Sequence, residues 1–219
     1  MNDDDPPEHS ATSGTLYVVA TPIGNLEDMT FRAVRVLREV SVIAAEDTRA
    51  AQQLLTHFEI ARPTIVSFFE GNEAGRTEHL MARLEGGEDV ALISEAGTPA
   101  VSDPGQRLVQ AAVEAGVRVV PVPGASAALA ALVAAGLPTD SFLFVGFPAR
   151  DGGPRLQAFA RLRAVEATLV VYEAPGRTAA TLQDLAAGEG PKEIAAAVAL
   201  LTGKPRRQVS QLAVALKRD

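Results

Sequence analysis

The chain has 219 residues, of which 47% are hydrophobic and 21% are charged, a composition typical of a globular protein. It has no cysteine, which excludes disulfide bonds, thiolate metal sites, iron–sulfur clusters and a cysteine nucleophile. The net charge of -7 is unevenly distributed: residues 1–149 carry 9 basic and 20 acidic side chains, and residues 150–219 carry 11 basic and 7 acidic ones. This asymmetry is compatible with a polyanion that binds residues 150–219 only. It is equally compatible with chance together with an acidic tail.

The beginning of the chain is acidic and polar, and no apolar run approaches the length that spans a bilayer. We expect residues 1–14 to be a disordered acidic leader and the protein to be soluble and cytoplasmic. Because the chain has only three histidines, we expect no metal site.

After residue 14, short apolar runs alternate with segments of helical periodicity. Thr30 is a candidate N-cap of the first helix, and Asp103 followed by Pro104 resembles an N-cap and a first helical residue. Strands separated by helices predict βαβ units, and therefore an α/β fold with an open, mostly parallel sheet. Strands are predicted over residues 15–21, 40–47, 64–69, 89–94 and 117–122, and helices from about 31, over 48–58, 72–86, 103–116 and 124–136.

A smaller mixed α/β domain is predicted after a helix stop at Gly136-Leu137-Pro138. The two domains are therefore expected to be residues 15–137 and 138–219. The second contains predicted strands at 141–147 and 167–174, a turn at 151–154, helices at 155–164 and 176–187, and two segments at 193–201 and 208–216 that form either a hairpin or helices.

Polar, turn-forming segments follow each of the first five predicted strands, at 21–28, 46–49, 68–73, 94–105 and 121–127. Ligands of open α/β sheets bind outside the carboxyl ends of the strands, so we expect a ligand site at this edge. None of these segments has the glycine pattern of a P-loop or of a dinucleotide-binding turn.

Several segments of the chain resemble the ribosomal RNA small subunit methyltransferase I family, which belongs to a tetrapyrrole-methylase-like superfamily that depends on S-adenosylmethionine. The resemblance covers residues 15 to about 187, with motifs in order. It rests on ATPIGNLED and AEDTR, which are specific to the family, and on SEAGTPAVSDPG, VPGASAALA and YEAPGRT.

The resemblance implies the two-domain tetrapyrrole-methylase-like fold of class III methyltransferases, with S-adenosylmethionine as cofactor. It implies 2′-O-methylation of a cytidine ribose in the decoding region of 16S rRNA, the small ribosomal subunit as partner, and a homodimer. The second domain is short relative to the family. Two alternatives stay open: a methylase of a small molecule such as a tetrapyrrole, and a cofactor-binding relative without transferase activity.

The cofactor-binding positions implied by the resemblance are largely main-chain positions at loop ends. Small residues there allow close approach of the backbone to a ligand, although Ser126 is equally a candidate N-cap of its helix. The positions are Pro22, Glu95, Gly97, Thr98, Pro99, Ser102, Ser126 and Ala127, and in the second domain Phe147, Tyr172 and Ala174.

Methyl transfer to a ribose hydroxyl requires alignment and a nearby proton acceptor. Asp47 is a candidate base, Arg49 could bind a phosphate, and Asn25 could orient the hydroxyl. Alternatively, Asp47 or Thr48 caps a helix, Arg49 pairs with a carboxylate, and Asn25 is a turn residue. The other candidate carboxylates are Glu46, Glu95, Asp103 and Glu173.

Overall fold

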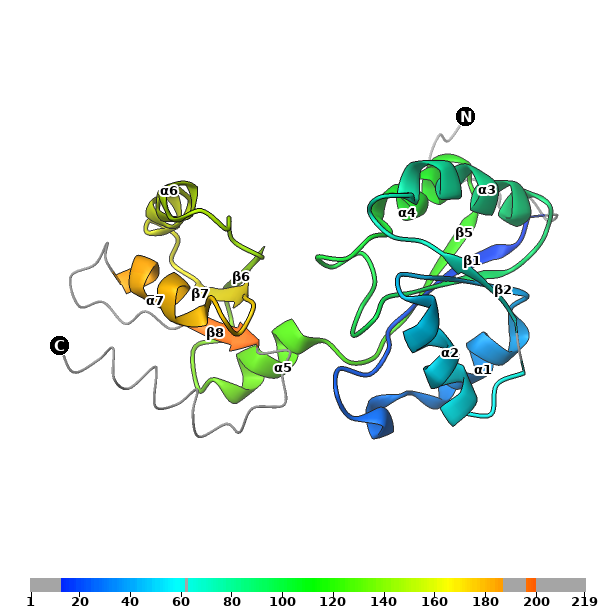
Figure 1. Cartoon of the computed structure of the whole chain (residues 1–219), viewed down its shortest axis with the longest axis horizontal. Coiled ribbons are helices and arrows are strands. Elements are labelled where there is room, and N and C mark those ends of the chain that lie inside the picture. Colours follow the sequence, from blue (N-terminus) through cyan, green and yellow to red (C-terminus); the bar gives the residue numbers. More distant parts are fainter. Residues whose placement is uncertain (1–12, 62, 187–195, 200–219) are drawn as a thin grey trace, which may run out of the picture. The chain divides into compact units, whose positions relative to one another are not determined.

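The computed structural model describes residues 13–61, 63–186 and 196–199, in two compact units that divide between Ser126 and Ala127 (Figure 1). The sequence predicts a boundary after residue 137. The observed division comes earlier in the chain, because helix α5 (Ala127–Ala134) belongs to the second unit. Its Ala128 and Leu132 share an apolar cluster with Val170 of strand β7 (Thr168–Tyr172). No helix within the described residues is both long and apolar enough to cross a membrane.

The first unit contains a five-stranded sheet in the order β3-β2-β4-β1-β5, and every pair of neighbouring strands is parallel. Strands β2 and β4 are buried at every position, as apolar β-branched runs in a parallel sheet should be. The strands are β1 (Thr15–Val19), β2 (Val42–Ala45), β3 (Thr64–Ser67), β4 (Val90–Ile93) and β5 (Arg118–Val122).

Helices cover both faces of this sheet (Figure 1). Leu37 and Leu55 anchor α1 and α2 in the apolar cluster on one face, while Leu80 and Leu108 anchor α3 and α4 in the cluster on the other. The predicted α/β fold with an open parallel sheet is therefore confirmed. The helices are α1 (Phe31–Glu39), α2 (Thr48–His57), α3 (Glu73–Glu85) and α4 (Gln106–Glu114), with a short 3₁₀ helix η1 (Leu26–Asp28) before α1.

The start of α1 is fixed by a local cap, whereas the start of α4 is fixed by a contact with another helix. Thr30 caps α1 as predicted, since its hydroxyl accepts from the Ala33 amide at 3.0 Å. The predicted start of α4 at Asp103 is wrong. Gly105 precedes the helix with φ +133°, and its amide donates to Glu73 Oε1 at 3.0 Å. A residue with that φ cannot continue a right-handed helix, so α4 begins after it.

Gly14, the last residue of the predicted disordered leader, is packed into the first unit. Gly14 is buried, and its amide donates to the Leu84 carbonyl at 2.7 Å. A β-carbon at this position would lie 2.1 Å from the Glu88 carbonyl oxygen, so only glycine fits. The rest of the predicted leader, residues 1–12, lies outside the described residues.

The second unit contains a parallel three-stranded sheet in the order β6-β7-β8, with β6 at Phe142–Gly146 and β8 at Ala196–Ala199. Helix α6 (Gly152–Leu162) begins where a turn was predicted, because Pro154 falls in its first turn, where its missing N–H breaks no helical hydrogen bond. Helix α7 spans Thr178–Ala186. The possible pairing with residues 208–216 lies outside the described residues.

The buried side chain of Arg155 connects several segments of the second unit. Arg155 of α6 is only 6% exposed; it forms an ion pair with Asp184 of α7, and its Nε donates to Asp184 Oδ2 at 2.7 Å. Its Nη1 also donates to the carbonyls of Ala149 and Arg150, at 3.4 and 2.9 Å. One side chain therefore joins two helices and the loop that follows β6.

We expect Arg155→Met to lower the free energy of unfolding of the second unit by about 2–4 kcal/mol, because Asp184 and two carbonyls would lose their partner. Urea denaturation followed by circular dichroism measures the change. Arg161→Met, at an exposed position of the same helix, is the control and should be nearly neutral. Equal midpoints for the Arg155 variant and the wild type would contradict this role.

Candidate functional site

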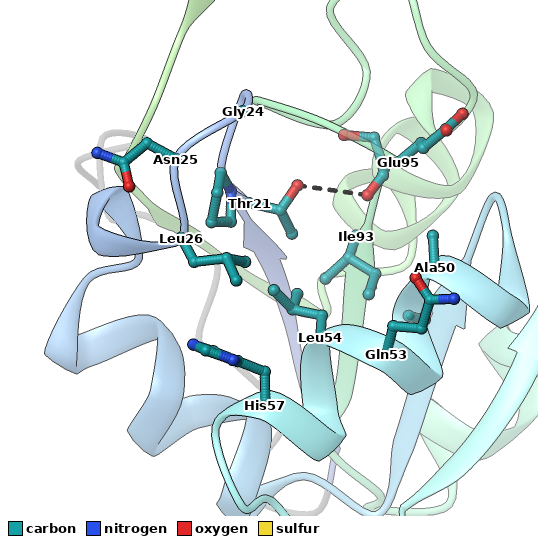
Figure 2. A pocket seen from close by; sticks show the side chains of 13 residues that line it. Thr21, Gly24, Asn25, Leu26, Ala50, Gln53, Leu54, His57, Ile93 and Glu95 are labelled. Carbon is teal, nitrogen blue, oxygen red and sulfur yellow. Dashed lines mark hydrogen bonds between the residues drawn. The ribbon is translucent and has the colours of Figure 1, made fainter.

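Three loops at the carboxyl edge of the larger sheet are joined directly to one another. Thr21, after β1, and Gly97, after β4, form an antiparallel bridge: each amide donates to the other's carbonyl, at 2.9 and 3.1 Å. The Thr21 hydroxyl also donates to the Ser94 carbonyl at 3.4 Å (Figure 2). Thr98 Oγ1 donates to the carbonyl of Ala125, in the loop after β5, at 3.3 Å. These contacts bring the segments at Pro22, Gly97–Thr98 and Ala125 together.

The loop after β4 has an unusual backbone. Gly97 has φ +87°, and the non-glycine residues Ala100 and Ser102 have φ +64° and +63°. Such conformations of non-glycine residues cost free energy and persist where surrounding contacts impose them. The loop that contains five of the predicted cofactor positions is therefore held in a specific shape; they are Glu95, Gly97, Thr98, Pro99 and Ser102.

Carboxylates from two loops gather beside this backbone. Burial raises the pKa of Asp103 to about 6, and the negative charges of Glu46 and Glu95 add to the rise, against a hydrogen bond from Ser94. The Glu95 amide donates to Glu46 Oε2 at 3.5 Å, which connects the loops after β2 and β4. Such a cluster favours a bound cation, and Asp103 could exchange a proton near neutral pH. Among the described residues, no group of three potential ligands has the arrangement of a metal site.

The predicted base Asp47 is the N-cap of α2. Its Oδ1 accepts from the amides of Arg49 and Ala50, at 2.7 and 3.0 Å. Both hydrogen bonds, and the one from Ala50 most strongly, lower the pKa of Asp47 below the ordinary value of an aspartate. Asn25 similarly caps η1, since its Oδ1 accepts from the Glu27 amide at 3.1 Å. The capping role considered for Asp47 is thus observed, and Asn25, considered as a turn residue, caps η1. Arg49, by contrast, has no ion-pair partner among the described side chains.

A pocket of about 290 Å³ opens between the loop after β1 and helix α2 (Figure 2). Of the predicted site residues, only Pro22, Asn25 and Glu95 line it. Sequence reasoning missed the contribution of α2, although Gln53 and His57 are spaced by one helical turn. The lining residues are Thr21, Pro22, Gly24, Asn25, Leu26, Ala50, Ala51, Gln53, Leu54, His57, Ile93, Ser94 and Glu95.

The predicted site residues of the second unit also lie together. The rings of Phe147 and Tyr172 pack edge to face, with their centroids 5.5 Å apart, and Phe147 is 51% exposed. The Tyr172 hydroxyl accepts from the Ala128 amide at 3.1 Å, which fixes the start of α5 at Ala127. Ala174 follows β7, and its carbonyl accepts from the Arg177 amide at 2.9 Å.

Glu173 is engaged in a network of its own. Its side chain is buried, its Oε2 accepts from Thr181 Oγ1 at 2.6 Å, and its Oε1 accepts from the Ala174 amide at 2.7 Å. The same Oε1 forms an ion pair with Arg177 at 2.5 Å. Because both oxygens are occupied, we assign Glu173 a structural role.

Comparison with known proteins places these features in a family. The sequence model described as Tetrapyrrole (Corrin/Porphyrin) Methylases matches residues 15–213. A solved structure of uroporphyrin-III C-methyl transferase from Thermus thermophilus, complexed with S-adenyl homocysteine, is similar with a TM-score of 0.55 and 25% identity, over 82% of this chain and 80% of that one.

Two curated relatives bear the name ribosomal RNA small subunit methyltransferase I. The Synechocystis sp. protein is 54% identical over 172 residues, or 78% of this chain and 61% of the relative, so this chain spans about three fifths of that protein. The Xylella fastidiosa protein is 48% identical over 192 residues, or 88% of this chain and 70% of the relative. The chain therefore belongs to the ribosomal RNA small subunit methyltransferase I family, within the tetrapyrrole methylases.

Proposed function

We propose that the protein is an S-adenosylmethionine-dependent methyltransferase that methylates the 2′-hydroxyl of a cytidine ribose in the decoding region of 16S rRNA. The observation that carries this proposal is the hydrogen-bonded convergence of the loops after β1, β4 and β5, which are the segments expected to hold the cofactor. The names of the relatives support the substrate class. An enzyme of this kind works in the cytoplasm, on the small ribosomal subunit; the expected homodimer stays a prediction.

The residues at this edge suit S-adenosylmethionine, which supplies an electrophilic methyl group when bound. The amide and carbonyl of Gly97 are bonded to Thr21, so an adenosyl group would contact this loop through the backbone beside Gly97, such as that of Thr98. Pro22 and Ser126 would hold it from the neighbouring loops. The carboxylates of Glu46, Glu95 and Asp103 would favour its positive sulfonium over a neutral thioether. The contacts expected from Phe147, Tyr172 and Ala174 of the second unit stay predictions.

The acceptor hydroxyl must lose its proton as its oxygen forms the bond to the methyl carbon. Asp47 is poorly suited to take this proton, because the hydrogen bonds that cap α2 favour its ionised form and lower its pKa. Asp103 is better suited, since its pKa of about 6 lies closer to neutral pH. We therefore place the proton acceptor at Asp103 and retain Asp47 as the residue that fixes the start of α2 and with it Arg49, which binds a phosphate of the RNA.

The purified chain with radiolabelled S-adenosylmethionine should label small ribosomal subunits that lack the methyl group, and the label should map to a cytidine 2′-oxygen. A porphyrinoid offered in parallel should stay unlabelled. Label on the porphyrinoid alone, or binding of the cofactor without transfer to any RNA, would contradict the proposal.

Substitution of each aspartate by asparagine distinguishes the roles of Asp103 and Asp47. Asp103→Asn should lower kcat about a hundredfold or more while the Kd for S-adenosylmethionine changes by only a few fold, because the proton acceptor is lost. Asp47→Asn should keep most of the activity, because asparagine is an equally good N-cap. Single-turnover kinetics and calorimetric titration measure the two quantities. If Asp47→Asn lowered kcat more than Asp103→Asn, Asp47 and not Asp103 would be the proton acceptor.

Because the cofactor is positively charged, its affinity should depend on pH through Asp103. Below pH 6 the protonated Asp103 removes one negative charge from the cluster, so affinity for the sulfonium should rise from pH 5 to pH 8 by a few fold, or on the order of 1 kcal/mol. S-adenosylhomocysteine has the same shape and a neutral sulfur, and its affinity should rise less. Calorimetry of both ligands with the wild type and Asp103→Asn measures this difference. Parallel pH profiles for the two ligands would contradict it.

A further inference from the structure

The pocket beside α2 has features that the proposed cofactor site does not explain. Leu26, Leu54 and Ile93 form an apolar floor, and the side chains of Gln53 and His57 flank it (Figure 2). Its volume of about 290 Å³ lies at the lower limit of small-molecule sites, which suits one planar group of the size of a nucleobase. Most cofactor positions expected in the loop after β4 do not line it; Glu95 does.

Helix α2 presents polar side chains at this pocket: Gln53 and His57 line it, and Arg49 lies one turn before Gln53, outside the lining. Arg49, Gln53 and His57 follow one another at intervals of four residues, so they share one side of the helix, and all three are exposed. A guanidinium binds phosphate, and a carboxamide and an imidazole can hydrogen-bond to the edge of a base. These exposed side chains therefore offer groups that bind a phosphate and the edge of a base on one side of the helix.

The imidazole of His57 packs against a neighbouring aromatic ring. It meets the ring of Phe58 edge to face, with centroids 4.8 Å apart and an interplanar angle of 87°. Phe58 packs against the apolar cluster under α1 and α2, and its carbonyl accepts from Arg38 Nη2 at 3.0 Å. The ring of His57 is thus supported on one side and open on the other, which reduces the entropy lost when a ligand binds.

We propose that this pocket binds one unpaired nucleotide of the RNA substrate, adjacent to the nucleotide that is methylated. Its base lies on the floor of Leu54 and Ile93, between His57 and Gln53, and its phosphate faces Arg49. This inference rests on the proposed function and adds to it a subsite that selects unpaired RNA, since only an unstacked base can enter.

The test compares two double variants of the full chain. Gln53→Ala with His57→Ala removes the flanks of the pocket. Gln52→Ala with His79→Ala is the matched control, because these residues are exposed, are of the same types, and do not line the pocket. Fluorescence anisotropy with a single-stranded oligoribonucleotide of the decoding region measures the RNA Kd, and calorimetry measures the Kd for S-adenosylmethionine.

For the first double variant, we expect the RNA Kd and the KM for undermethylated subunits to rise about tenfold, with kcat and the cofactor Kd unchanged. The control should match the wild type in all four quantities. An RNA Kd equal to the wild type would overturn the inference, as would a cofactor Kd that rises by the same factor, which would show that the pocket holds the cofactor.

The same measurements distinguish this inference from the proposed function. If the wild type methylates subunits and the first double variant does so with an unchanged KM, the subsite is wrong and the function stands. If the wild type transfers no methyl group but its binding of the oligoribonucleotide still depends on Gln53 and His57, the function is wrong and the subsite stands.

Discussion

The backbone bridge between Thr21 and Gly97 determines the arrangement of the loops at the carboxyl edge of the large sheet. β1 and β4 are neighbours in the sheet although most of the first unit separates them in sequence, so their following loops leave the sheet side by side. The two hydrogen bonds of the bridge turn this proximity into a fixed geometry, and Thr98 extends it to the loop after β5. A ligand that contacts all three loops finds them already ordered, so its binding carries a smaller entropy cost.

The same edge concentrates negative charge, and this has consequences for chemistry. The carboxylates of Glu46 and Glu95 come from different loops, yet both act on Asp103, whose partial burial is the larger cause of its raised pKa. Asp47, next to Glu46 in the sequence, is affected in the opposite direction, because the amides at the start of α2 stabilise its charged form. Two aspartates at one sheet edge therefore differ: Asp47 caps its helix, and Asp103 is the carboxylate that we propose for proton transfer.

Helix α2 connects the cofactor edge with the proposed RNA subsite. Its buried side, with Ala51 and Leu55, packs into the apolar core of the first unit. Its outer side presents Arg49, Gln53 and His57. Since the helix is anchored by the Asp47 cap at one end and by the core along its length, these polar side chains project from a rigid element, which is the more precise way to position a binding group.

The sequence by itself determined the alternation of strands and helices, the parallel sheet and the cap at Thr30, and it offered Asp47 or Thr48 as the cap of the next helix. These features depend on periodicity and on residues within three or four positions of each other, which a sequence displays directly. Only the tertiary structure decided that α4 starts after Gly105, because the amide of that residue bonds to Glu73 on another helix. It likewise decided that α5 belongs to the second unit, and that Asp103 is the carboxylate with the raised pKa. Burial, charge neighbours and packing partners come from segments distant in sequence, and no local pattern contains them.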